Sequence, residues 1–305
     1  MLSVIIPSRT EEFLNQTIQD VLDKATGEIE VFPVLDGYDY DDYHIIKDYK
    51  PILDPRVKYI HLPNNGTMQK RQGINAGVSI AKGEYVMSLD AHCMMDKGFD
   101  EKLAKDCDDD WVVIPRRLRL HAEDWTIEDG PDQPPIDYEY WMHRAFIGNF
   151  KDHRFGELHG YKWNQRTIER KDILIDETMT IQASCWFMKK KYFNRLGLMQ
   201  VDGYTGWGQE AEEICLKTWT SGGKVMTNKK TWYAHLHKGG KWGRMYYMTK
   251  YQRDASIKYS YDFWVNKNRK EFAKVINHFM PIPNWTEDWE KHIWTPEGIL
   301  NTKFK

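Results

Sequence analysis

The stretch YVMSLDAHCMM, residues 85–95, joins a strand-like apolar run to an acid and an imidazole. Residues two apart in extended backbone point to the same side, so Asp90 and His92 are predicted to face one point. A carboxylate oxygen and an imidazole nitrogen form half of a mononuclear metal site, and this mixture suits Mn²⁺ better than Ca²⁺. The alternative is that Asp90 caps the following turn while His92 is a partly buried hydrogen-bonding side chain.

Further strands and helices alternate along the first 90 residues. The strand-like runs are SVIIP (3–7), IEVFPVLDG (29–37), VKYIHL (57–62) and EYVMSLD (84–90). Apolar periodicity predicts helices over 11–24, with Thr10 as the N-cap, and over 68–80. This alternation predicts a parallel α/β sheet.

In such sheets ligands bind at the carboxyl ends of the strands, where Asp36, Asp90 and the segment Pro7–Arg9 are predicted to lie. Residues 116–180 lose periodicity and are predicted to form long loops over the sheet. A strand running into a short helix is predicted over 180–193 and a helix over 208–223.

The composition indicates a folded chain of one large domain or of one domain with an extension. It has 305 residues, 14% of them aromatic. No apolar run approaches the roughly 20 residues that cross a bilayer, so no membrane partner is expected. The N-terminus lacks the features of a signal peptide and is interpreted as the first strand. Four scattered cysteines indicate neither a disulfide framework nor a zinc ribbon, and a cytoplasmic location is expected.

Charge is distributed unevenly along the chain. Residues 217–274 contain 14 Lys and Arg against three acidic residues, a net of +11, so the remainder carries −13 of the total of −2. The same segment holds 12 aromatic residues. Such a split indicates a surface that faces a partner. The residues from 245 to 279 are predicted to form a basic, aromatic, helical extension.

Three segments resemble a known family. LDAHC (89–93) resembles the Leu-Asp-Ser-His-Cys segment of the polypeptide N-acetylgalactosaminyltransferases, and AGVSIAKGEYVMSLD (76–90) resembles the run before the metal motif of GT-A nucleotide-sugar transferases. Residues 185–223 resemble the former family's Phe-to-Leu-Gly segment and its Trp-Gly-Gly-Glu helix, down to the terminal Gly-Gly. The resemblance covers about residues 3–240.

The resemblance implies a GT-A fold, a Rossmann-like mixed and mostly parallel sheet flanked by helices. On this basis residues 1–240 are predicted to form the catalytic domain, and residues 241–305 an extension that serves as lid and acceptor site. The implied donor is a nucleoside diphosphate sugar, UDP-linked by resemblance, and the implied stereochemistry is retention. The metal would be Mn²⁺, with Mg²⁺ as the alternative.

Individual residues carry over by resemblance. His235 matches the third metal ligand, although His237 is a neighbouring candidate. Asp36 matches the acid that contacts uracil or ribose, and Glu210 matches a glutamate near the sugar and the acceptor. The alternative for Glu210 is a structural carboxylate that is stabilised at a helix start. The nearby Trp207, itself predicted to bind the donor, favours a functional role for Glu210.

Three positions depart from the resembled family. Gln209 replaces a glycine, Ala211 an asparagine and Met94 an acid. These positions are expected near the sugar, so they argue against N-acetylgalactosamine as the transferred group. The sequence also shows no lectin domain and no membrane stem, which argues against a Golgi peptide-modifying role.

Further cations are predicted to contact the donor. Arg71, beside Lys70 at a helix start, is a candidate for the diphosphate, with a solvated helix face as an equal alternative. Pro7 and Arg9 join the predicted donor site from the first strand end. HKGGKWGRMYY (237–247) combines glycines, cations and aromatics as a closing lid would, with Arg244 over the diphosphate; a plain surface loop is the alternative.

Three hypotheses compete for the function. The first is transfer to a hydroxymethylated pyrimidine such as 5-hydroxymethylcytosine in double-stranded DNA, as in a phage-type DNA-modifying enzyme in a host cytosol. The basic aromatic segment would then bind DNA through Trp242, Lys250, Arg253 and Lys258. The second is transfer to a protein hydroxyl or a surface polysaccharide. The third is an inactive binding module, which the full Asp90, His92 and His235 set disfavours. Oligomeric state and sugar identity stay open.

Overall fold

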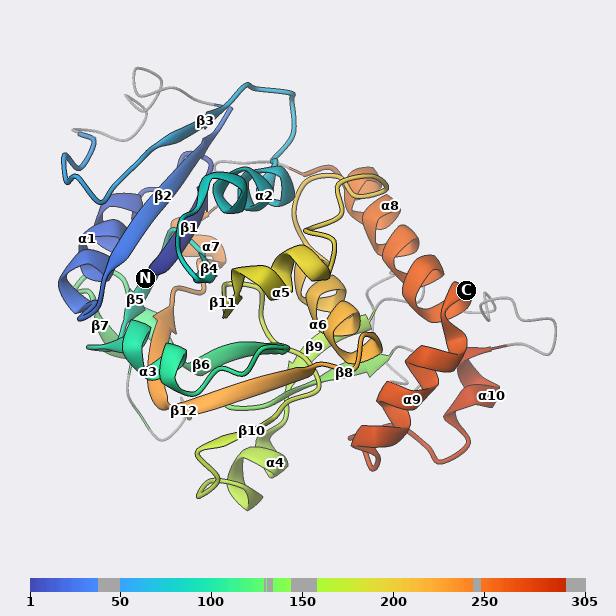
Figure 1. Cartoon of the computed structure of the whole chain (residues 1–305). Helices are drawn as coiled ribbons and strands as arrows, with labels where there is room; N and C mark the ends of the chain where they lie inside the picture. The colour runs from blue at the N-terminus through green and yellow to red at the C-terminus, as the bar shows by residue number, and fades with distance from the viewer. Residues whose placement is uncertain (38–49, 129, 131–133, 144–157, 244–247, 295–305) are drawn as a thin grey trace.

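The computed structural model describes residues 1–37, 50–128, 130, 134–143, 158–243 and 248–294. Within these residues the central sheet has ten strands (Figure 1). Eight of them lie in the order β10 (Ile175–Glu177), β12 (Lys224–His235), β6 (Trp111–His121), β11 (Cys185–Lys189), β4 (Tyr85–Leu89), β1 (Leu2–Ser8), β2 (Ile29–Asp36) and β3 (Ile60–Leu62). β5 (Cys93–Met95) adds to β12, and β7 (Thr126–Glu128) adds to β6.

The sheet is mixed, as predicted. β4, β1, β2 and β3 run parallel, and so do β12 and β6, while β11 runs antiparallel between β4 and β6. Their buried apolar side chains explain the continuous hydrophobic runs in the sequence. A separate two-stranded sheet pairs β8 (Glu139–His143) with β9 (Leu158–Lys162). The mixed, mostly parallel α/β class expected from the sequence is confirmed.

Helices cover both faces of the sheet. The first six are α1 (Leu14–Lys24), α2 (Lys70–Ile80), α3 (Phe99–Lys105), α4 (Asn164–Glu169), α5 (Lys190–Arg195) and α6 (Glu210–Thr220). The α2 helix packs unusually close to β1, because a Cβ on Gly77 would lie 2.6 Å from Ile5 Cγ1. This close approach brings the first residue of α2, Lys70, to the carboxyl ends of the strands.

The C-terminal segment is helical, as predicted. It contains α7 (Gly239–Trp242), α8 (Lys250–Tyr261), a π-helical turn at Asp262–Lys267, α9 (Arg269–Phe279) and α10 (Trp289–Ile293). In Figure 1 α8 and α9 lie beside α6, and α9 contacts α6, whereas α7 lies apart from them near β1 and β4. In the described part of the chain, no helix is both long and apolar enough to cross a membrane.

Two local predictions are wrong. Thr10 does not cap α1: it has φ +51°, and the helix begins at Leu14 after Phe13. Residues 116–180 are not simply loops, because β6 extends to His121 and β7, β8, β9, α4 and β10 follow. The arginines of β6 interrupt the apolar pattern that identifies a buried strand. All four cysteines are described, and each is a buried free thiol.

Candidate active site

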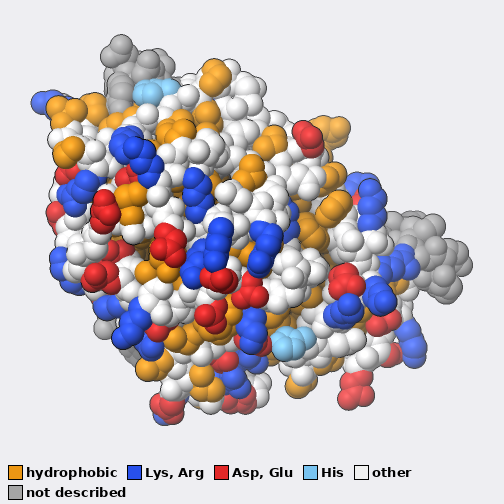
Figure 2. All heavy atoms as spheres, in the orientation of Figure 1, with side chains coloured by type: hydrophobic (Ala, Val, Ile, Leu, Met, Phe, Trp, Pro, Cys, Tyr) orange, Lys and Arg blue, Asp and Glu red, His pale blue; other side chains and the backbone are white. Residues whose placement is uncertain are grey.

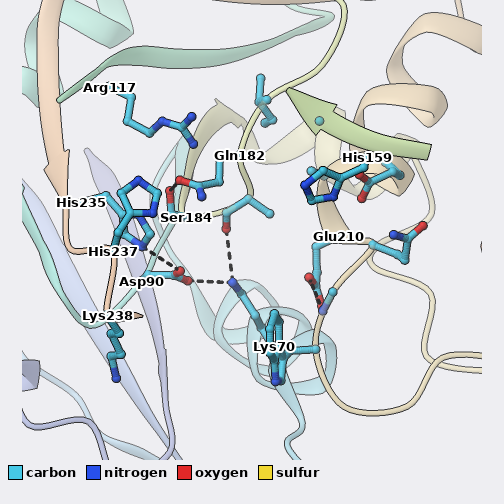
Figure 3. A pocket seen from close by; sticks show the side chains of 18 of the residues that line it. Lys70, Asp90, Arg117, His159, Gln182, Ser184, Glu210, His235, His237 and Lys238 are labelled. Carbon is cyan, nitrogen blue, oxygen red and sulfur yellow. Dashed lines mark hydrogen bonds and ion pairs between the residues drawn. The ribbon is translucent and has the colours of Figure 1, made fainter. Parts of the chain in front are cut away.

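The structure brings the three predicted metal ligands together. Asp90 follows β4, His92 precedes β5 and His235 ends β12. The antiparallel pairing of β5 with β12 places His235 opposite Cys93, next to His92 in the chain. One ligand atom from each residue lies within 4.8 Å of the others. Figure 3 labels two of the three, Asp90 and His235. A carboxylate and two imidazoles at this spacing can hold one divalent ion.

The electrostatics of this cluster favour the protonation states that metal binding requires. Burial raises the pKa of Asp90. The positive charge of Lys70 and the interactions with His235 and His92 outweigh burial, so the pKa lies below its usual range. Burial lowers the pKa of His235 to about 3, which keeps the imidazole neutral. Among the described residues, neither ring nitrogen of His235 meets a hydrogen-bond partner, although both are buried.

Lys70 supplies a fixed positive charge beside the cluster. Its Nζ donates to Asp90 Oδ1 at 2.7 Å and to the carbonyl of Ala183 at 3.3 Å. Burial lowers its pKa, but the charges of Asp90 and Glu210 more than compensate, so the pKa is raised. Asp90 therefore presents one oxygen to an ammonium, while its other oxygen lies 3.6 Å from His235 Nε2.

Glu11 contacts the His92 ring, and the sequence did not predict Glu11 as a site residue. Its Oε2 lies 3.3 Å from His92 Nδ1 and also accepts from Lys238 Nζ. Burial raises the pKa of Glu11, but His92 and Lys238 outweigh this effect and leave it lowered. A carboxylate behind a ligating histidine fixes the ring orientation and raises its basicity.

We expect Glu11→Gln to weaken Mn²⁺ binding about 10- to 100-fold, because the amide cannot hold the His92 ring as the carboxylate does. Calorimetric titration of Mn²⁺ into the variant measures the change. Glu12→Gln is the matched control, since Glu12 is the exposed next residue and should bind Mn²⁺ like the parent. Equal affinity in both variants would remove Glu11 from the site.

The cluster opens into a cavity of about 730 Å³. Pro7 and Glu11 line it from the end of β1, and Lys70 from the start of α2. Arg253, Ser256 and Ile257 of α8 form another part of the wall, together with Met248, which precedes the helix. Arg253, predicted as a DNA contact outside the donor pocket, therefore faces the cavity.

Asp36 and Arg9 form one buried network at the ends of β1 and β2. Arg9 Nη1 donates to Asp36 Oδ1 at 3.3 Å, and Gln69 donates to the same carboxylate from its backbone at 2.6 Å and its side chain at 3.0 Å. A carboxylate has about four acceptor positions. Asp36 is 2% exposed and lies outside the residues that line the cavity, so the role its contacts show is to join β1, β2 and the start of α2.

Arg71 lies away from the position predicted for it. It is 2% exposed, pairs with Glu213, donates to the Gly208 carbonyl at 3.0 Å and lies over the Tyr204 ring. Its guanidinium fastens α2 to α6 and to the preceding loop. The cation that reaches the cavity from this helix is its neighbour, Lys70.

Trp207, Gln209 and Glu210 line the cavity at the start of α6. Glu210 is 3% exposed and accepts from the Gly208 amide at 2.8 and 3.0 Å, so it also stabilises the helix start. Gln209 has φ +63°, a left-handed conformation that costs a non-glycine residue roughly 1–2 kcal/mol. The glycine of the resembled family would adopt it without that cost.

The other predicted acceptor residues are scattered. Trp242 packs edge-on against Phe13 at 5.1 Å, Lys250 is exposed at the start of α8, and Lys258 pairs with Asp262. Arg244 lies outside the described residues. Figure 2 shows Lys and Arg side chains interspersed with acidic side chains over the face of the molecule that is in view. Several cations of residues 217–274 pair with acids, among them Lys217 with Glu213, Lys224 with Glu177 and Lys230 with Asp106.

Comparisons with known proteins identify the family of the chain. The family model described as glycosyl transferase family 2 matches residues 3–197. Polypeptide N-acetylgalactosaminyltransferase 12 of Mus musculus is 25% identical over 250 residues, which are 77% of this chain and 39% of that protein. Polypeptide N-acetylgalactosaminyltransferase 5 of Caenorhabditis elegans is 27% identical over 235 residues, 73% of this chain and 35% of that protein. The chain thus spans well under half the length of these relatives.

A solved structure shares the fold. The crystal structure of GalNAc-T7 with UDP, GalNAc and Mn²⁺ superposes with a TM-score of 0.62 at 17% identity, covering 96% of this chain and 53% of that one.

Proposed function

The chain belongs to glycosyl transferase family 2, and from this premise we propose that it transfers a sugar from a UDP-sugar to a hydroxyl group with the help of a divalent metal ion, Mn²⁺ the first candidate. The observation that carries the proposal is the Asp90, His92 and His235 cluster in the wall of an open cavity. Its low-pKa carboxylate and neutral imidazole suit a borderline divalent ion.

Each part of the cavity has a role in this reaction. A bound cation would stabilise the negative charge that builds on the leaving diphosphate. Lys70 adds a second, permanent positive charge beside Asp90. Glu210, 3% exposed at the start of α6, is the carboxylate proposed to face the sugar and the acceptor hydroxyl. The α8 wall limits water access, so the sugar passes to the acceptor in preference to hydrolysis. The proposal includes retention at the anomeric carbon. This stereochemistry rests on the resemblance to the N-acetylgalactosaminyltransferases and on no residue of the site.

For the nucleotide we propose binding at the ends of β1 and β2. Pro7 lines the cavity there, and Arg9, Asp36 and Gln69 form the network behind it. Asp36 has about one acceptor position left for a uracil N–H or a ribose hydroxyl.

A polypeptide hydroxyl, a surface polysaccharide and double-stranded DNA remain as acceptor classes, and two of them have an observation in their favour. A polypeptide hydroxyl is the first, because relatives of this chain are named polypeptide N-acetylgalactosaminyltransferases. Double-stranded DNA is the second, on the strength of the +11 net charge of residues 217–274. The pairing of several of these cations with acids weakens that second argument.

We expect UDP to bind more tightly than GDP or CDP when Mn²⁺ is present, and to lose most of its affinity in excess chelator. Calorimetry with the three nucleotides measures this. Tighter binding of GDP would sink the uridine assignment, and binding indifferent to chelation would sink the metal. A screen of peptide, glycan, plain DNA and hydroxymethylated DNA acceptors, read by mass spectrometry, then separates the acceptor classes.

A further inference from the structure

A second cluster of cations lies on β6, beside the metal ligands. Arg117 and Arg119 are two residues apart, so both point to the same face of the strand. β6 runs parallel to β12, with Arg119 opposite His235 and Arg117 opposite Tyr233. Both arginines line the cavity. Figure 3 shows Arg117 extending toward Gln182, on the same side of the cavity as His235.

Arg117 is buried without a full set of partners. It is 5% exposed, and its Nη2 donates to Glu139 Oε1 at 2.9 Å. Within the described part of the chain, its Nε and Nη1 have no hydrogen-bond partner. A buried donor without a partner is destabilising, and more so when it is charged. Such a guanidinium at a cavity wall is typical of a site that a ligand completes.

The surroundings leave a surplus of positive charge. Glu139 neutralises Arg117, and Glu212 is a further acid in the lining, but Arg119 and Lys162 add two cations. His159 and Tyr161, both exposed on β9, also line the cavity. Tyr161 offers a ring face on which a sugar or an acceptor can pack.

Along the strand Arg117 is set apart from the metal ligands, whereas Arg119 lies opposite His235. Arg117 lies opposite Tyr233, two residues or about 6.6 Å of strand before His235. Glu139, on β8, holds the Arg117 guanidinium on the side of that two-stranded sheet. The diphosphate must lie at the metal ligands, so the ligand of Arg117 lies beyond it, where the sugar or the acceptor binds.

We propose that Arg117, with Arg119 and Lys162, binds a carboxylate or phosphate group carried by the transferred sugar or by the acceptor. Guanidinium groups match the geometry and charge of these oxyanions. The inference rests on the proposed function, which it deepens by assigning an acidic substrate to the cavity.

Sulfate is the probe for the site. Protein saturated with Mn²⁺ and UDP, so that the diphosphate site is filled, is titrated with sulfate in a calorimeter. We expect Arg117→Met to bind sulfate at least about tenfold more weakly than the parent. Arg117→Lys, which keeps the charge, should fall between the two and guards against misfolding of the first variant. Arg116→Met is the matched control, because Arg116 pairs with Asp137 at 2.7 and 2.8 Å from the opposite face of β6.

Two donors identify the source of the oxyanion. Competition of sulfate with UDP-glucuronate but not with UDP-glucose assigns the group to the transferred sugar. Sulfate binding that affects neither donor assigns it to the acceptor.

Absence of sulfate binding to the Mn²⁺–UDP complex, or equal binding by Arg117→Met and the parent, overturns the anion site and leaves the proposed function standing. Loss of Mn²⁺-dependent UDP binding in the parent overturns the proposed function instead, whatever sulfate does.

Discussion

Asp90→Asn is expected to lower sugar transfer by about a thousandfold or more, because the neutral amide is a poor metal ligand and the cation contributes several kcal/mol to the transition state. The same change should abolish calorimetric Mn²⁺ binding. The rate at which UDP is released during sugar transfer measures the effect. The substitution also leaves the buried Lys70 ammonium without its carboxylate, so thermal melting must accompany the assay.

Asp96→Asn is the control for this experiment. Asp96 is another largely buried acid paired with a lysine, Lys102, at 2.6 Å, yet it lies outside the residues that line the cavity. We expect this variant to keep its metal affinity and activity. An Asp90→Asn protein that stays folded and active in excess chelator would show that the cluster holds no catalytic metal.

Arg71→Met is expected to destabilise the protein by about 3 kcal/mol, because it leaves Glu213 as a buried charge that has lost its closest partner. Glu213 is fully buried, and among the described residues its side chain would keep the Gln200 amide at 2.7 Å and Lys217 at 2.6 Å. Urea unfolding measures the loss.

Arg56→Met provides the comparison, since the exposed Arg56–Asp54 pair at 2.9 Å should contribute within about 1 kcal/mol. If the two variants lose equal stability, Arg71 is not the fastener between α2 and α6 that its contacts indicate.

Most of the first 90 residues could be predicted from sequence because β1, β2 and β4 are buried on both faces. SVIIP and IEVFPVLD are continuous apolar runs, and the spacing of Asp90 and His92 follows from strand geometry alone. β6 was missed because it borders the cavity: Arg117 and Arg119 occupy positions where a core strand carries apolar residues. The feature that concealed the strand is the one that supports the anion site.

Partners of long side chains could not be predicted from local sequence. Arg71 and Lys70 are adjacent at the start of α2, and only the fold decides that Arg71 meets Glu213, 142 residues later, while Lys70 meets Asp90. Arg253 looked like one more cation of a basic segment, and the packing of α8 turns it into the cavity. Glu11 carried one usable signal, its place just after the first strand, at the edge where ligands bind.

The origin of the cavity wall has a practical consequence. The three metal-facing side chains lie at or next to strand ends, whereas Met248, Arg253 and Ile257 reach the cavity from α8 and the residues before it. Under the proposed function, the metal ligands and this part of the substrate wall therefore come from separate elements. A combinatorial library confined to these three positions is expected to change the specificity for the sugar or the acceptor while the metal ligands stay constant.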